Sequence, residues 1–82
     1  MIFIEVVFHN KIRDKINEYK KNNGTSRTFI ANKMGISRQS LNSLEDSNNP
    51  TIQMLIKLAV VLDCEVKDLY NYDILMMTEK NL

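Results

Sequence analysis

Residues 27–45, RTFIANKMGISRQSLNSLE, limit the fold of this chain more than any other stretch. Ser26, just before them, can accept a hydrogen bond from an unpaired amide in the first turn of a helix, and Ser37 can do the same for a second helix. Gly35 follows the last helically spaced residue of the first helix, where a residue without a β-carbon can take the left-handed conformation that ends a helix. We therefore predict a helix, a tight turn and a second helix. Apolar or small residues stand where this arrangement needs inward-facing side chains (Ile30, Ala31, Met34, Ile36, Leu41 and Leu44).

The second helix, predicted over residues 37–45, has an outer face of amide, hydroxyl and guanidinium groups with no aliphatic residue among them. In the major groove arginine can bond guanine bidentately, glutamine and asparagine can bond adenine, and serine can bond either, each good pair discriminating by roughly 1–3 kcal/mol. A polar outer face is also what an ordinary solvated helix shows. Because this helix follows a helix and a turn, we predict that it reads DNA bases (through Arg38, Gln39, Ser40, Asn42 and Ser43).

The net charge of +1 argues against a nucleic-acid binder, but the distribution of charge argues for one. Residues 9–43 contain eight basic and two acidic side chains, whereas residues 44–82 contain three basic and seven acidic ones. The first part therefore carries +6 and the second −4. A basic half that includes the polar helix is what attraction to phosphates and counterion release from DNA require.

Residues 27–44 resemble the twenty-residue helix-turn-helix pattern of the Cro and phage-repressor type, also called the xenobiotic-response-element type. The similarity lies at the small Ala31, the turn Gly35 and the apolar positions named above. It continues through the Pro-Thr pair at 50–51 and the run KLAVVLDCEVKDLY, and so covers residues 10–70. The resemblance implies a mainly α, five-helix, lambda-repressor-like DNA-binding domain that acts as a transcriptional regulator, here predicted to be a repressor, and works as a homodimer.

The same resemblance implies how the domain meets double-stranded DNA. The two recognition helices of a dimer, about 34 Å apart on one DNA face, would read a palindromic operator. A pair between Lys20, at a position that is usually arginine in the family, and Glu45 would tie the first helix to the end of the recognition helix. We expect phosphates to be gripped by helix amides and by side chains around the motif (Ser26, Arg27, Thr28, Ser37 and Asn48).

Both ends of the chain carry apolar segments. Residues 1–9, MIFIEVVFH, are a β-branched and aromatic run, too short to span a membrane and without the features of a signal peptide, so we predict a β-strand. A lone strand leaves an unpaired edge, and the best candidate for its mate is residues 72–77, YDILMM, of the same chain or of a second one. Family members commonly lack such a strand. Asn10 can then cap a helix that runs to about residue 22.

Residues 51–62 predict a helix that is apolar over more than one face. Such a helix must be covered on more than one side, by the terminal strands or by a second subunit. A last short helix is predicted to begin at Glu65, whose carboxylate favours the positive end of the helix dipole, and to be anchored by Val66 and Leu69. The core positions of the longer helix (Ile52, Leu55, Leu58, Ala59 and Leu62) are accompanied by further apolar residues (Met54, Ile56, Val60 and Val61).

The lone cysteine, Cys64, allows no internal disulfide, and no ligand-spaced His or Cys accompanies it, so we predict neither a metal nor a cofactor. No catalytic set can be assembled from the side chains, and we predict that the chain is not an enzyme. We expect one cytoplasmic helix-turn-helix domain over residues 1–82, with a strand (1–9), a helical core (10–70) and a C-terminal strand or tail (71–82), and no membrane association.

A second interpretation stays open. The same fold can serve as an antitoxin or a protein-interaction module, with the apolar terminal strands as the docking surface. A regulatory partner protein could also control DNA binding, because no effector pocket or nucleotide motif is visible in the sequence.

Overall fold

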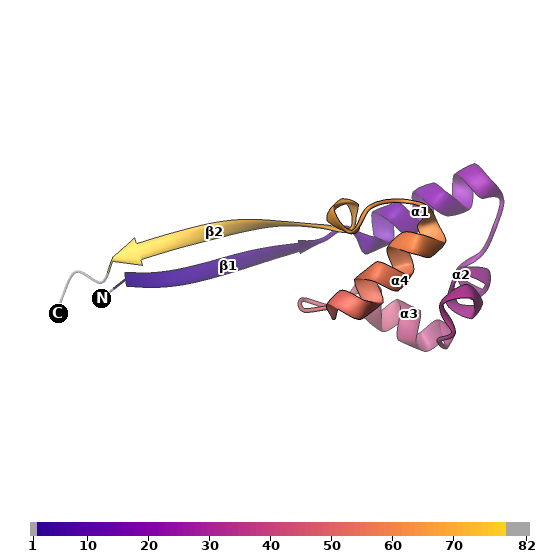
Figure 1. Ribbon diagram of the computed structural model, residues 1–82, viewed down its shortest axis with the longest axis horizontal. Coiled ribbons are helices and arrows are strands. Elements are labelled where there is room, and N and C mark those ends of the chain that lie inside the picture. Colours follow the sequence, from indigo (N-terminus) through magenta and orange to yellow (C-terminus); the bar gives the residue numbers. More distant parts are fainter. Residues whose placement is uncertain (1, 79–82) are drawn as a thin grey trace.

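The structure is a computed structural model that describes residues 2–78. Four helices form a body, and two strands project from it as a long ribbon with both ends of the described chain at its far tip (Figure 1). The molecule extends 56 Å along its longest axis and 22 and 16 Å across it. The elements in chain order are β1 (Ile2–Asn10), α1 (Ile12–Asn23), α2 (Arg27–Met34), α3 (Arg38–Glu45), α4 (Ile52–Leu62), a 3-10 turn η1 (Val66–Asp68) and β2 (Tyr70–Thr78).

The predicted helix-turn-helix is present, with the predicted boundaries. Ser26, Ser37 and Thr51 begin α2, α3 and α4, and each side-chain oxygen accepts a hydrogen bond of 3.0–3.2 Å from the amide three residues further on. Each such cap contributes about 1 kcal/mol to helix stability. Gly35 ends α2 in the left-handed region, with φ of 72°. The turn is therefore encoded locally, by the caps and one glycine.

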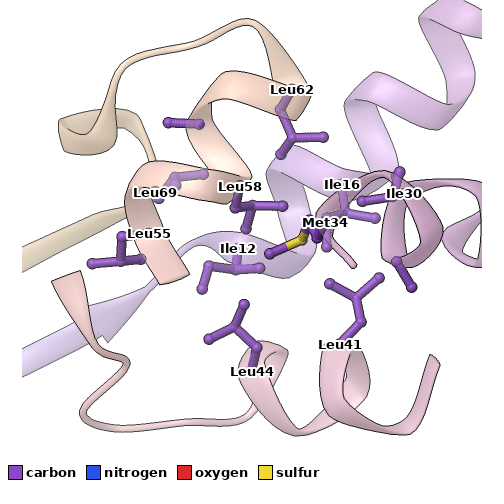
Figure 2. Packing of buried hydrophobic residues seen from close by; sticks show 12 residues of the cluster. Ile12, Ile16, Ile30, Met34, Leu41, Leu44, Leu55, Leu58, Leu62 and Leu69 are labelled. Carbon is purple, nitrogen blue, oxygen red and sulfur yellow. The ribbon is translucent and has the colours of Figure 1, made fainter. Parts of the chain in front are cut away.

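The helices surround one apolar core. Side chains from α1, α2, α3 and α4 converge there, and Leu69, after η1, closes the core from the side (Figure 2). Ala31 is 1% exposed, which fits the predicted close approach of two helices at that residue. The largest fully buried side chains are aliphatic (Ile12, Ile16, Ile30, Leu41, Leu58 and Leu69). The packing of these residues holds α3 against the body.

The two terminal strands pair with each other within one chain. β1 and β2 are antiparallel, and the register runs from Ile2 opposite Thr78 to Asn10 opposite Tyr70. The predicted pairing of the two apolar ends is thus confirmed for the intramolecular alternative. The backbone amide of Lys11 also donates to the carbonyl oxygen of Leu69 at 2.9 Å, which joins the base of the ribbon to the helical body.

The predicted fifth helix is a single 3-10 turn, so residues 2–78 contain four α-helices where the prediction for the domain was five. Only three residues lie between Glu65 and Leu69, and they close two bonds of 3.0 Å, from Asp68 to the carbonyl of Glu65 and from Leu69 to that of Val66. The Asp68 carboxylate accepts a further bond from the Glu65 amide. Because β2 begins at Tyr70, no residue remains to continue an α-helical turn.

The outer face of α4 is less covered than predicted. Leu55, Leu58, Ala59 and Leu62 are buried as expected, but Ile52, placed in the core by the sequence pattern, is 63% exposed. The ribbon cannot cover this face because it projects away from the body (Figure 1). Ile56 and Val60, on the same side as Ile52, are likewise exposed. In the described part of the chain, no helix is long and apolar enough to cross a bilayer.

Truncating Leu41, a buried leucine of α3, should destabilise the motif more than truncating a side chain on the exposed face of the same helix. We expect Leu41→Ala to lower the free energy of unfolding by roughly 2–5 kcal/mol, because it leaves a cavity beneath the helix. Gln39→Ala, on the exposed side of the same helix, should change it by less than about 0.5 kcal/mol. Reversible urea denaturation followed by circular dichroism measures both. Equal effects of the two substitutions would contradict the assigned orientation of α3.

Candidate nucleic-acid interface

The outer face of α3 carries all five predicted base-reading side chains, and all five are exposed (Arg38, Gln39, Ser40, Asn42 and Ser43). They are held there because Leu41 and Leu44 on the opposite side are buried in the core. Five neighbouring polar side chains on a helix that is fixed from behind form a rigid surface of donors and acceptors. Such a surface has the chemistry that base edges in the major groove recognise.

Part of this face is ordered before any ligand binds. The Arg38 guanidinium donates to the Asn42 amide oxygen at 3.3 Å and to the Thr28 hydroxyl at 3.4 Å. The hydroxyls of Ser37 and Ser40 are 2.9 Å apart. Within residues 2–78 the Gln39 side chain makes no hydrogen bond, so both its amide donor and its acceptor are available.

Glu45, the last residue of α3, is held by Arg27 from α2. The Glu45 side chain is only 3% exposed, and Arg27 approaches it with Nη2 at 2.9 Å and Nε at 3.2 Å from Oε1. Arg27 also donates to the Asn17 amide oxygen of α1 at 2.6 Å, and Arg13 of α1 lies 3.8 Å from Glu45. The ion pair therefore joins three helices.

The predicted partner of Glu45 was Lys20, and the structure corrects this. Within residues 2–78 the cations within 4.0 Å of the Glu45 carboxylate belong to Arg27 and Arg13. A guanidinium presents two parallel donors that match a carboxylate, whereas a lysine ammonium is a point charge. Arg27 begins α2, directly beside the end of α3, and takes this position instead of Lys20.

The Arg27 side chain is engaged by Glu45, and the phosphate contact predicted for Arg27 stays a prediction. This side chain is 15% exposed, and its charge is compensated by Glu45. Its backbone amide and that of Thr28 still begin α2 without intrahelical acceptors. The other predicted phosphate-binding residues are exposed around the motif (Ser26, Thr28, Ser37 and Asn48).

Arg13 makes a second, more exposed contact with the end of α3. Its guanidinium donates to the Asp46 carboxylate, and this hydrogen bond and the charge of Asp46 raise the pKa of Arg13. Both side chains are more than half exposed, so the pair orients α1 against α3 without adding much stability.

Asn10 has a positioning role that the sequence did not predict. Its amide oxygen accepts from the Ile12 amide at 2.9 Å, which is the expected contribution to the start of α1, although Lys11 occupies the N-cap position. Its amide nitrogen donates to the carbonyl oxygens of Leu44 at 3.0 Å and Ser47 at 2.8 Å. One side chain at the base of the ribbon thus satisfies backbone groups of α1 and of the end of α3. Only the position of Asn10 at a strand-to-helix junction could have suggested this.

Two further observations concern the titratable groups of residues 2–78. Among residues 2–78, no three His, Cys, Asp or Glu side chains gather where they could hold a metal. Cys64 is half-buried at the side of a cavity of about 390 Å³ lined also by Lys15, Glu18 and Tyr19. Burial, and the charge of Asp68, raise the pKa of its thiol.

The helix-turn-helix family model matches residues 16–69, and the chain belongs to this family, in its Cro and phage-repressor type. It is 39% identical over 62 residues to the HTH-type transcriptional regulator SinR of Bacillus licheniformis, an alignment that covers 73% of this chain and 56% of that protein. SinR of Bacillus subtilis strain 168 is 38% identical over 60 residues, with 71% and 54% covered. This chain therefore spans about half the length of these relatives.

An uncharacterized HTH-type transcriptional regulator of Archaeoglobus fulgidus is 29% identical over 63 residues, covering 76% of this chain and 90% of that protein. The family match, residues 16–69, contains the turn, α2, α3 and α4, but neither strand of the ribbon. The ribbon is accordingly a feature that the family model does not describe.

Removing Arg27 should destabilise the fold far more than removing Lys20. Arg27→Ala leaves the buried Glu45 without its main partner, and we expect a loss of about 3 kcal/mol in the free energy of unfolding. Lys20→Ala should cost less than about 0.5 kcal/mol, because it removes a surface charge. Chemical denaturation of the two variants compares them directly. If Lys20→Ala proved the more damaging of the two, the Arg27 pairing would be wrong.

Proposed function

We propose that this chain is a sequence-specific, double-stranded DNA-binding transcriptional repressor that reads the major groove with its third helix, residues 37–45. The observation that carries the proposal is the exposed polar face of α3, fixed from behind by buried leucines and at its end by the Arg27–Glu45 pair. Rigid placement matters because bidentate base contacts tolerate little error in position. The relatives, named as transcriptional regulators, support this class of function.

In this proposal Gln39 makes the main base contact. Its amide is exposed and makes no hydrogen bond to residues 2–78, so it can bond an adenine edge without first breaking an internal contact. Arg38 is oriented by its hydrogen bonds to Asn42 and Thr28. It either bonds guanine directly or holds Asn42 in position for its own base contact. Ser40, Asn42 and Ser43 complete the reading surface.

Phosphate contacts set the register of the protein on the duplex. Thr28 and Ser37 contribute exposed hydroxyls, and Asn48 an amide, on either side of α3. Ser26 and the backbone amides that begin α2 form the end of a helix whose dipole favours a phosphate. Arg27 takes part through its amide, while its side chain orders the motif from behind.

The regulator acts as a homodimer on a palindromic operator in the cytoplasm. One copy of α3 reads only a few base pairs, and two copies about 34 Å apart double the contacts on one DNA face. A bound dimer would exclude polymerase from the same DNA, which is repression without any cofactor. Release would come from a change in concentration, from a regulatory partner protein or from proteolysis.

Selection of bound fragments from the source genome, followed by titration across a salt series, tests the proposal. We expect enrichment of a short palindrome that binds at least about a thousandfold more tightly than an unrelated duplex. Gln39→Ala should relax the preference at one base pair, by about 1–3 kcal/mol. Gln53→Ala, which removes the same type of side chain from the exposed start of α4, should leave the base preference unchanged.

The contrary result is weak binding that falls steeply with salt and enriches no sequence. That outcome would mean that the chain grips phosphates without reading bases. It would refute a sequence-specific repressor, whatever the state of the dimer.

A further inference from the structure

One face of the β1–β2 ribbon is apolar between its two ends, where Asn10 and Thr78 stand. Directly opposed residues of an antiparallel pair point to the same side, and successive residues alternate. Val6 lies opposite Ile74 and Ile4 opposite Met76, so these four share a face, which we call the apolar face. Six of its side chains are 52–70% exposed (Ile2, Ile4, Val6, Tyr72, Ile74 and Met76).

The other face of the ribbon, which we call the mixed face, carries the charges. Glu5 lies opposite Leu75, and Val7 opposite Asp73. His9 contacts the Asp73 carboxylate at 2.9 Å on the same side. Aliphatic residues of this face are less exposed than those of the apolar face, Val7 being 37% and Val6 60% exposed. The ribbon is thus amphipathic. The strand register determines which residues lie on each of its two faces.

The helical body leaves the apolar face open. The ribbon extends away from the helices along most of its length (Figure 1). Only near its base do rings stack, Phe8 with Tyr70 at 5.7 Å between ring centroids and Tyr70 with Tyr72 at 6.4 Å. An isolated two-stranded ribbon is marginally stable in water and gains stability when further strands or a helix cover its apolar face. A cover from outside the described chain is therefore needed.

The ribbon offers no cationic side chain to a nucleic acid as that cover. Residues 2–10 and 70–78 contain Glu5 and Asp73 but no lysine or arginine. Acidic side chains on a ribbon repel phosphates, so this element adds nothing to the grip on DNA. Its apolar face requires an apolar counterpart.

We propose that the apolar face binds the same face of a second copy of this chain, so that the two ribbons stack as a two-layer, four-stranded dimerisation element. A two-fold axis brings identical patches together, which makes the interface self-complementary. Stacking the apolar faces leaves both mixed faces outside, and the acidic Glu5 and Asp73 of the two copies are kept apart by the layers. Sheets packed in this way lie about 10 Å apart.

The size of the face sets the expected strength of the dimer. Nine residues at about 3.3 Å each, on two strands about 4.8 Å apart, give a face of roughly 30 by 10 Å. That is on the order of 300 Å² in outline per copy, at the scale of the largest apolar patches of monomers and below the roughly 800 Å² per partner of a standard interface. We therefore expect a weak dimer, with a dissociation constant in the micromolar range or higher. The dimer of the proposed repressor rests on this contact, although the contact forms without DNA.

Two adjacent valines on opposite faces provide the test. Val6→Lys places an ammonium group in the middle of the apolar face and should raise the dimer dissociation constant of the full chain at least about a hundredfold. Val7→Lys, on the mixed face, puts lysine opposite Asp73 and should change it by less than about threefold. Sedimentation equilibrium over a concentration series measures both. A wild-type chain that stays monomeric throughout, or equal effects of the two lysines, overturns the proposal.

A crosslinking experiment covers the case in which Val6→Lys loses the dimer only because the variant unfolds. In a Cys64→Ser background, a bis-maleimide crosslinker with a span of about 10 Å should join Val6→Cys of one copy to Val6→Cys of the other, whereas it should not join Val7→Cys, because stacked sheets lie about 10 Å apart. Equal crosslinking of the two overturns the assignment of faces. Both measurements are made without DNA, so they test the ribbon contact separately from the proposed function. If the chain forms the dimer but enriches no operator, only the proposed repressor function is refuted. If the wild-type chain binds an operator as a monomer, only the proposed ribbon contact is refuted.

Discussion

The buried ion pair between Arg27 and Glu45 is the constraint on which the placement of the polar face of α3 depends. A carboxylate that is 3% exposed needs a close partner, since an unpaired buried charge costs several kcal/mol. That requirement fixes the first turn of α2 beside the last residue of α3, at the opposite end from the Gly35 turn. With Leu41 and Leu44 buried between these two points, α3 has little freedom to tilt. The outward side chains are therefore presented in one orientation.

Because of this pair, the arginines of the chain have different roles. The Arg27 side chain pairs with Glu45, and that of Arg13 pairs with Asp46. Of the two arginines in the helix-turn-helix, Arg38 is therefore the one whose guanidinium lies on the exposed face. A net charge of only +1 is therefore compatible with the proposed role of this face in DNA binding. In the proposed function, specificity would come from amides and hydroxyls at fixed positions, and general attraction from exposed lysines in the basic half of the chain.

Features that depend on neighbouring residues could be predicted from the sequence, and features that depend on distant packing could not. The caps at Ser26 and Ser37 and the turn at Gly35 are local, and the structure has them as predicted. The partner of Glu45 depends on how three helices cross, and a rule taken from resemblance selected Lys20 instead of Arg27. Apolar spacing placed Ile52 in the core, but periodicity cannot tell which apolar side of α4 the body covers.

The site residues divide in the same way. The exposed face of α3 followed from its amphipathic pattern, because the inward leucines determine which residues face out. The engagement of the Arg27 side chain and the bridging role of Asn10 did not follow, since both depend on the end of α3 lying beside segments remote in sequence. Whether these side chains read bases and grip phosphates stays a prediction.

The register of the ribbon has a consequence for how the chain folds. Its closest paired positions, Asn10 and Tyr70, are 60 residues apart, and its tip joins Ile2 to Thr78. Contacts among the four helices span much shorter loops, and closing a long loop costs entropy that only later contacts recover. The helices should therefore assemble first, and their assembly brings the two termini to neighbouring points at the base of the ribbon. From there the strands can pair progressively toward the tip. Pulsed hydrogen exchange would show whether the helices are protected before the strands.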